Sequence, residues 1–393
     1  LGLRAAEAVF LGRPVRGSGQ TERDGTLQFV ADVSLSAEGL RQLLALPARD
    51  YLRGEMLAHA DIRLKGGVLD VRVGSSLQGL ESSLPAPLRK PAQLEWPLNF
   101  SWRKDSAKTE QNWQIELDRR LNIAWEDRCT PRCDFARGFV AYGTKAELPA
   151  QGWRLAGQFD RLDVDPWRAF FAEQNKDGRL TTDAEAVLAG LVFETNELIV
   201  AGHRFRDVVG KALRQDGRWS LVLKGPQAEG NLVWAEAGRG MLLARLKHLT
   251  LDPLPVATPV EQSSTVPEND VPGTLTELPG LDVIADKFQL RKLDLGRLEL
   301  FAVNADKLWH LQKISLNSTD LRLEGRGLWR GMGMNTNTHL DFELDSDNVG
   351  AMLARLGYPN TVRDGKAQLD GVREWRGPAC AAQFPTLSGS WWR

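Results

Sequence analysis

The chain has 393 residues, 42% of them hydrophobic and 26% charged, which is enough apolar content for a folded core and too little for a membrane-embedded bundle. Its 50 Lys and Arg residues balance 51 Asp and Glu residues, and the two signs are interleaved without a basic block. A phosphate-neutralising surface is therefore excluded, and we expect no nucleic-acid partner.

No apolar run reaches the roughly 20 residues that a membrane-spanning helix needs. The chain also begins at Leu1, without a methionine or a charged leader. We therefore expect a piece of a larger protein whose membrane anchor lies outside this chain. The most apolar stretch, 241–246, contains Arg245 and fits a buried strand or a short helix.

Apolar and polar residues alternate along the chain in runs of about four to eight, the pattern of half-buried strands. Turn residues separate these runs, as at 65–67, 215–217 and 228–231. The predicted fold is mainly β: an extended, twisted antiparallel β-sheet bent into a hydrophobic groove, with a few short helices. The clearest strands are 68–73, 113–117, 121–125, 219–223, 321–323 and 340–344.

Three short helices have readable starting signals. Ser36 precedes the first, Asp165 caps the second with Pro166 at its first position, and Asp347 precedes the third. Gly357 ends the third helix.

The chain divides at a segment rich in Pro, Ser, Thr and acidic residues, which predicts a linker or long loop. Before it we place a β-groove segment with a short helix and a β-groove repeat segment, and after it a C-terminal β segment. The predicted boundaries of these four parts are 1–95, 96–251, 252–279 and 280–393.

A weak internal repeat supports an extended stack of similar units. Trp219 and Trp234 bracket two alternating runs, and Trp309 and Trp329 bracket a similar pair. Chance likeness between two tryptophan-containing meanders is the alternative. The chain holds 13 tryptophans against three tyrosines, which fits either ordinary packing or a lipid interface.

Recognisable catalytic frames are missing from the sequence, so we expect no enzyme, cofactor or metal site. The five histidines are scattered singly. A calcium-like loop begins at Glu173, but Ala184 stands where its last carboxylate is needed. A glycan hydrolase would need two carboxylates, such as Asp163 and Asp165, about 5 to 10 Å apart in a cleft.

Cys129 and Cys133 flank a proline-containing turn and could close a small disulfide loop in an oxidising compartment. They could equally stay free, and the sequence leaves both alternatives open.

A strand at 68–73 leads into a Ser-x-Leu-x-Gly turn at 75–79 and a Leu-Pro-x-Pro-Leu-x-Lys stretch at 84–90. These motifs resemble the YhdP family of AsmA-like periplasmic proteins, of which the chain would be a C-terminal part. Further similar stretches follow in order at 278–283, 295–300, 325–329, 348–357, 375–378 and 387–389. The end at 391–393 departs from the family pattern, which indicates truncation.

The resemblance implies a periplasmic protein, tethered to the inner membrane in its full-length form. It implies a non-catalytic conduit that carries phospholipids between the inner and outer membranes. The implied partners are phospholipid acyl chains and the membranes at the ends of the full-length protein, while envelope protein partners stay unknown. The alternative is a structural β-scaffold for envelope protein–protein interactions.

If the groove exists, alternation predicts which side chains line it, although a slip of one residue would turn them outward. The predicted lining residues are Val71, Val73, Ile115, Leu117, Ile123, Leu221, Leu223, Leu298, Leu300, Leu321, Leu323, Phe342 and Leu344.

Overall fold

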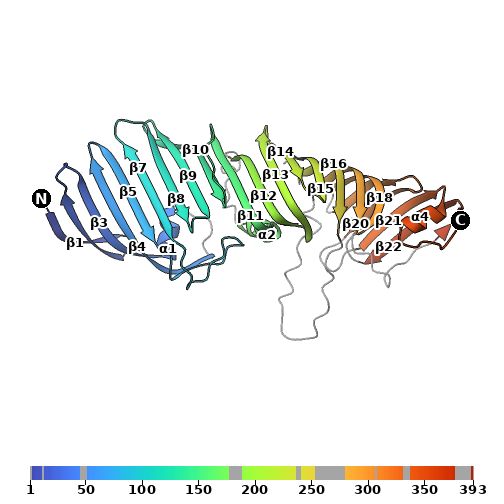
Figure 1. Ribbon diagram of the computed structural model, residues 1–393, viewed down its shortest axis with the longest axis horizontal. Coiled ribbons are helices and arrows are strands. Elements are labelled where there is room, and N and C mark those ends of the chain that lie inside the picture. Colours follow the sequence, from blue (N-terminus) through green and yellow to red (C-terminus); the bar gives the residue numbers. More distant parts are fainter. Residues whose placement is uncertain are drawn as a thin grey trace. The chain divides into compact units, whose positions relative to one another are not determined.

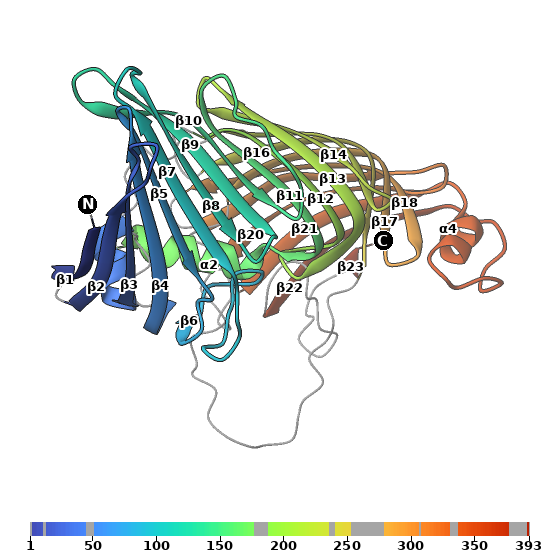
Figure 2. The same ribbon diagram turned by 60° about the vertical axis from the view of Figure 1, so that its left-hand side comes forward.

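In the computed structural model the chain divides into two compact units, Leu1–Thr195 (unit 1) and Asn196–Arg393 (unit 2). Both consist mainly of strands, which confirms the predicted fold class, and the strands lie side by side in twisted sheets (Figure 1 and Figure 2). The structure describes residues 2–10, 13–44, 51–176, 188–235, 240–252, 279–305, 308–330, 337–376 and 391–392. Most of the predicted linker and most of the calcium-like loop lie outside these residues.

Unit 1 pairs its strands in chain order, and β6 joins only the start of β4. Its strands are β1 (Gly2–Phe10), β2 (Arg13–Thr21), β3 (Leu27–Ser36), β4 (Leu52–Lys65), β5 (Val68–Ser75), β6 (Leu80–Ser82), β7 (Leu98–Asp105), β8 (Glu110–Leu117), β9 (Leu121–Cys129), β10 (Cys133–Tyr142) and β11 (Gly152–Asp163). Strand β12 (Leu188–Val200) spans the division between the units.

Unit 2 also pairs its strands in chain order from β13 onward. They are β13 (His203–Gln215), β14 (Arg218–Lys224), β15 (Ala228–Ala235), β16 (Met241–Leu251), β17 (Gly280–Leu290), β18 (Leu293–Ala305), β19 (Leu308–Asn317), β20 (Arg322–Arg330), β21 (Asn337–Ser346), β22 (Ala367–Arg376) and β23 (Trp391–Trp392).

The prediction of antiparallel pairing is wrong at two pairs, since β10–β11 and β16–β17 are parallel. A parallel neighbour needs a connection that returns to the start of the next strand. After β10, residues 143–151 make this return, and Pro149 is buried there.

The predicted turn at 228–231 is also wrong, because these residues belong to β15. Gly230 lies where the pairing with β16 shifts register, with φ of 154° and the backbone of Arg245 and Leu246 close against it. The glycine therefore marks a β-bulge within the strand.

The helices fall where the sequence predicts them, as α1 (Ala37–Leu44), α2 (Asp165–Lys176) and α4 (Val349–Arg355). Ser36 Oγ accepts from the Gly39 N–H at 3.1 Å, and Gly357 ends the helical segment with φ of 91°. The cap of α4 is Asn348, not Asp347, because the Asn348 side chain accepts from the Ala351 N–H at 2.9 Å.

Candidate functional site: the apolar faces of the two sheets

The register of unit 1 collects apolar side chains on one face of its sheet. Phe29 on β3 pairs with Ile62 on β4, Ile62 with Val71 on β5, and Val71 with Trp102 on β7. The row continues from Trp102 through Trp113, Trp125, Gly138 and Trp153 on β8 to β11. Side chains opposite each other in a sheet share a face, so these positions form a stripe across the strands. We call this side the apolar face of unit 1.

Four tryptophans form the aromatic row of this face: Trp102, Trp113, Trp125 and Trp153. The first three are stacked, with ring centroids 4.9 and 5.3 Å apart, and Trp125 lies 6.4 Å from Trp153. Each ring remains half-buried. The row thus presents a broad apolar surface, held rigid by ring packing, within reach of other molecules.

Gly138 makes the last step of the aromatic row possible. A Cβ at this position would lie 2.5 Å from the Trp153 ring, so the indole occupies the space that a side chain would need. Phe135, also on β10, stacks on Trp153 with centroids 4.8 Å apart. The glycine is therefore a packing requirement of the row.

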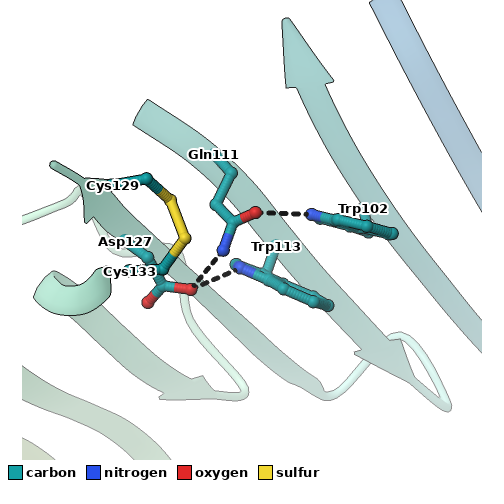
Figure 3. The surroundings of a disulfide bond; sticks show 6 residues. All are labelled: Trp102, Gln111, Trp113, Asp127, Cys129 and Cys133. Carbon is teal, nitrogen blue, oxygen red and sulfur yellow. Dashed lines mark hydrogen bonds between the residues drawn. A yellow bond between two sulfur atoms is a disulfide. The ribbon is translucent and has the colours of Figure 1, made fainter. Parts of the chain in front are cut away.

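A polar row runs beside the aromatic row, nearer the strand ends, and consists of Lys104, Gln111 and Asp127 in register on β7, β8 and β9. Gln111 accepts from Trp102 Nε1 at 3.3 Å and donates to Asp127 Oδ2 at 3.0 Å (Figure 3). The same carboxylate oxygen accepts from Trp113 Nε1 at 2.8 Å. These bonds fix the indole edges that face the strand ends.

A disulfide closes the hairpin next to the polar row. Cys129 and Cys133 are opposite each other on β9 and β10, and their sulfur atoms are joined at 2.09 Å (Figure 3). Of the two alternatives that the sequence leaves open, the structure therefore forms the bridge. It lies two residues beyond Asp127, so it restrains the strand that holds the carboxylate.

At the opposite strand ends, a cluster of buried apolar residues covers the face. Ala37 at the start of α1 and Leu77 and Leu80 from the 76–97 segment are buried with Leu35 and Met56 of the sheet. Helix α2 is tied to the same segment, since Trp167 Nε1 donates to the Ala86 carbonyl at 2.8 Å. We call this cover, formed by α1 and 76–97, the plug of unit 1.

Lys90 joins two stretches of the 76–97 segment within the plug. It is only 2% exposed, and its ammonium donates to the carbonyls of Leu77 and Leu80, each at 2.8 Å, and of Pro91 at 3.2 Å. Burial lowers the pKa of this lysine, while the three carbonyls satisfy its donors. The motif that ends in Lys90 thus has a structural role, binding the 75–79 turn to the 84–90 stretch.

The central row on the apolar face of unit 2 is aliphatic where that of unit 1 is aromatic. One row of register partners runs from Leu221 on β14 through Leu232, Ala244, Val283, Leu300 and Ile314 to Gly325, Phe342 and Gly371 on β22. The tryptophan pairs of the predicted repeat, Trp219 with Trp234 and Trp309 with Trp329, are opposite each other on this face. Leu356, which follows α4, packs on the cluster around Leu246 and Leu298.

Within each unit, the predicted lining residues that lie in paired strands all fall on the apolar face. Val71, Val73, Ile115, Leu117 and Ile123 share that of unit 1. In unit 2 the residues on the apolar face are Leu221, Leu223, Leu298, Leu300, Leu323, Phe342 and Leu344. Leu321 precedes β20, outside the register pairs, and is buried. Their contact with lipid stays a prediction.

Sequence reasoning missed Lys90, Gly138 and the polar row. Lys104, Gln111 and Asp127 occupy positions of the alternation that point to the apolar face, so this signal was available. The hydrogen bonds of Lys90 within the plug and the packing of the Trp153 ring over Gly138 could not be found in this way. Alternation shows which residues of one strand share a face, but not which side chains touch.

The described residues hold no cluster of His, Cys, Asp and Glu suited to a metal. Asp163, one of the suggested hydrolase carboxylates, accepts from the Asp165 N–H at 3.2 Å where α2 begins. Both therefore have a local structural explanation. Among the described helices, none is long and apolar enough to cross a membrane.

Open sheets with one apolar and one charged face define a class of protein that offers apolar molecules a surface. The comparison with family models is more specific, since the family described as YhdP protein matches residues 2–391. The chain therefore belongs to the YhdP family, an AsmA-like, envelope-associated family that is not known as enzymatic, and the resemblance is confirmed. Comparisons with curated proteins and with solved structures found no match.

Proposed function

We propose that the chain is a non-catalytic carrier of phospholipids, which lays their acyl chains on the apolar faces of its two units. The full-length protein would be tethered to the inner membrane and carry lipid across the periplasm towards the outer membrane. The observation that carries this proposal is the aromatic row with its continuation through Val71, Ile62 and Phe29. Phe29 is 48% exposed and Leu64 beside it is 42% exposed, although both face the apolar side.

The energetics favour such a surface. At about 0.8 kcal/mol per CH₂, exposing one long acyl chain to water costs on the order of 10 kcal/mol. A row of register partners offers a succession of apolar contacts, so a chain lying across the strands exchanges one contact for the next. The acyl chain then moves over small energy barriers, and no chemical step is needed.

The outer face has the opposite character. On β8, Gln114 and Glu116 alternate with Ile115 and Leu117, and on β4 the outward residues His59 and Asp61 alternate with Ala60 and Ile62. Unit 1 can thus keep one side in water while the other holds lipid.

The scaffold alternative also has an observation in its favour. Val209, Leu213 and Val222 lie on the outer face of β13 and β14 and are 44%, 51% and 45% exposed. Such residues could meet a partner protein.

Mass spectrometry of lipids that co-purify with the folded chain in the absence of detergent tests the proposal. We expect phospholipid in the wild type and a severalfold loss in Phe29→Asp, which places a charge on an exposed part of the stripe. The matched control is Leu57→Asp on the outer face, a residue that is 75% exposed. A lipid-free folded wild type would contradict the carrier and favour the scaffold.

A further inference from the structure

The polar row is the one place where charge enters the central apolar face of unit 1. Among the register partners of β3, β4, β5, β7, β8, β9 and β10 that share this face, the charged residues are Lys104 and Asp127. Both lie in the polar row, with Gln111 between them. The neighbours of Lys104 on the β5 side are apolar, since Leu69 is its register partner.

Neither charge has an oppositely charged partner among the residues that the structure describes. The Lys104 ammonium has no hydrogen-bond or ion-pair partner within the described residues, although its side chain is half-buried. Asp127 accepts from Gln111 and Trp113 through Oδ2 and has no cationic partner among the same residues. Some outward charges of the neighbouring strands are paired with each other, as in Arg72 with Asp70 and Arg137 with Glu126.

The placement of these charges has chemical meaning. Lys104 and Asp127 lie on the same face, two strands apart, which places their backbones roughly 10 Å from each other. A ligand lying across β8 can therefore offer an anionic group to the ammonium and a cationic group to the carboxylate. A headgroup with a phosphodiester and an amine two carbons away carries both charges in one ligand.

We propose that Lys104 and Asp127 form a headgroup site for a zwitterionic phospholipid, with the phosphodiester on Lys104 and the ligand's ammonium on Asp127. This inference rests on the proposed function and specifies its substrate class. The acyl chains of the bound lipid leave the polar row over Trp102, Trp113 and Trp125. Gln111 holds Asp127 in place and is satisfied on both sides, so it positions the carboxylate without binding the headgroup.

The arrangement selects against two other lipid classes. A lipid with a net negative headgroup satisfies Lys104 but brings no cation to Asp127, and a neutral diacylglycerol satisfies neither charge. Selection then follows from leaving a partly buried charge unpaired.

The test uses dioleoyl phosphatidylethanolamine, dioleoyl phosphatidylglycerol and dioleoylglycerol with brominated acyl chains, offered in mixed micelles to the whole chain. Bromine quenches tryptophan fluorescence on contact, so each titration yields an affinity for the tryptophan-bearing apolar faces of both units. The part of that affinity that belongs to the headgroup site is the part that variants of Lys104 and Asp127 change. For wild type we expect the ethanolamine lipid to bind about five- to tenfold more tightly than the other two, the range of one or two partly exposed charge-assisted bonds.

Two variants separate the charges. Lys104→Gln should weaken both phospholipids about fivefold and leave dioleoylglycerol unchanged. Asp127→Asn keeps an acceptor for Trp113 and Gln111, and it should abolish the preference for ethanolamine over glycerol. Arg103→Gln makes the same charge change as Lys104→Gln on the outer face of β7 and should change nothing, while near-UV circular dichroism verifies the stacked tryptophans in every variant.

Equal affinity for all three lipids in wild type and both variants would overturn the headgroup site and leave the carrier proposal standing. Absence of quenching by every lipid would overturn the carrier proposal itself.

Discussion

The apolar faces of the two units share one strand alternation but differ in what fills it. Unit 1 places stacked tryptophans beside a row that contains Lys104 and Asp127. Unit 2 places leucine, isoleucine and valine there, with glycines such as Gly325 between them. Alternation therefore sets which face is apolar, and the chemistry of the inward residues sets what that face can recognise.

The difference suggests that the two faces would contribute differently to the proposed lipid binding. Indole rings are flat, rigid and polar at one edge, so they can orient a lipid beside a headgroup site. Aliphatic side chains offer contact without direction, which suits sliding of an acyl chain. The variants below alter one feature of unit 1 or unit 2 at a time.

The largest effect should come from the plug of unit 1. Lys90 is the one buried lysine among the described residues. Replacing it in Lys90→Met removes one donor from each of three carbonyls, of which that of Leu77 keeps the Leu80 N–H at 3.2 Å. We expect the free energy of unfolding to fall by about 3 kcal/mol. Urea denaturation measures this, and Arg89→Met at the exposed neighbouring position serves as the control. An unchanged midpoint for Lys90→Met would show that the plug does not depend on the ammonium.

The next largest loss of stability should come from removing the disulfide. Its loop is short, so the unfolded-state model predicts a loss of about 2 kcal/mol when Cys129→Ser and Cys133→Ser are combined. Denaturation with and without reductant checks it. Reductant should lower the unfolding midpoint of the wild type and leave that of the double variant unchanged. Sensitivity of the double variant to reductant would place the effect elsewhere.

Filling the space under Trp153 tests the aromatic row directly. Gly138→Ala puts a methyl group where the ring lies, so we expect a loss of about 1 to 2 kcal/mol and a weaker near-UV signal. Gly74→Ala is the matched control, since its added carbon would lie 4.0 Å from the nearest atom, the Leu98 carbonyl oxygen. Equal tolerance of both substitutions would mean that Trp153 is not held against β10.

The smallest effect concerns the outer face of unit 2, where ion pairs replace the apolar contacts. Hydrogen bonds from Lys313 and Arg297 lower the pKa of Glu299 below its ordinary value of 4.5. At pH values near and below 4.5 the unfolded state therefore binds more protons than the folded state. The stabilisation that is present above pH 4.5 is lost as the pH falls through the lowered pKa of Glu299. Lys313→Met should flatten this slope in acid titrations of unfolding, whereas an unaltered slope would assign it to other carboxylates.

Much of the fold was predictable because it depends on local periodicity. Strands such as 113–117 and 219–223 and the side chains that share a face follow from a repeat of two residues, and the helices follow from caps such as Ser36. The direction in which neighbouring strands pair does not follow from this repeat, so the sequence does not predict the parallel pairs β10–β11 and β16–β17. Gly230 forms a bulge where the sequence predicts a turn, because glycine permits both conformations.

The candidate site was only partly predictable for a related reason. Alternation placed Ile115 and Leu300 on their faces, but it cannot show that Trp102 meets Gln111, or that Lys90 reaches the Leu77 carbonyl. These contacts depend on rotamers and on loop paths that no periodic pattern encodes.

Photo-crosslinking from adjacent positions on opposite faces tests the central claim most directly. Crosslinkers replace Leu117, Leu223, Leu300 and Leu344 on the apolar faces, and Glu116, Val222, Glu299 and Glu343 on the outer faces. Val222 is the sharpest control, because it is apolar and 45% exposed yet turned away from Leu223. The account predicts phospholipid adducts at the first set alone. Equal labelling of Leu223 and Val222, or adducts at neither, would contradict it.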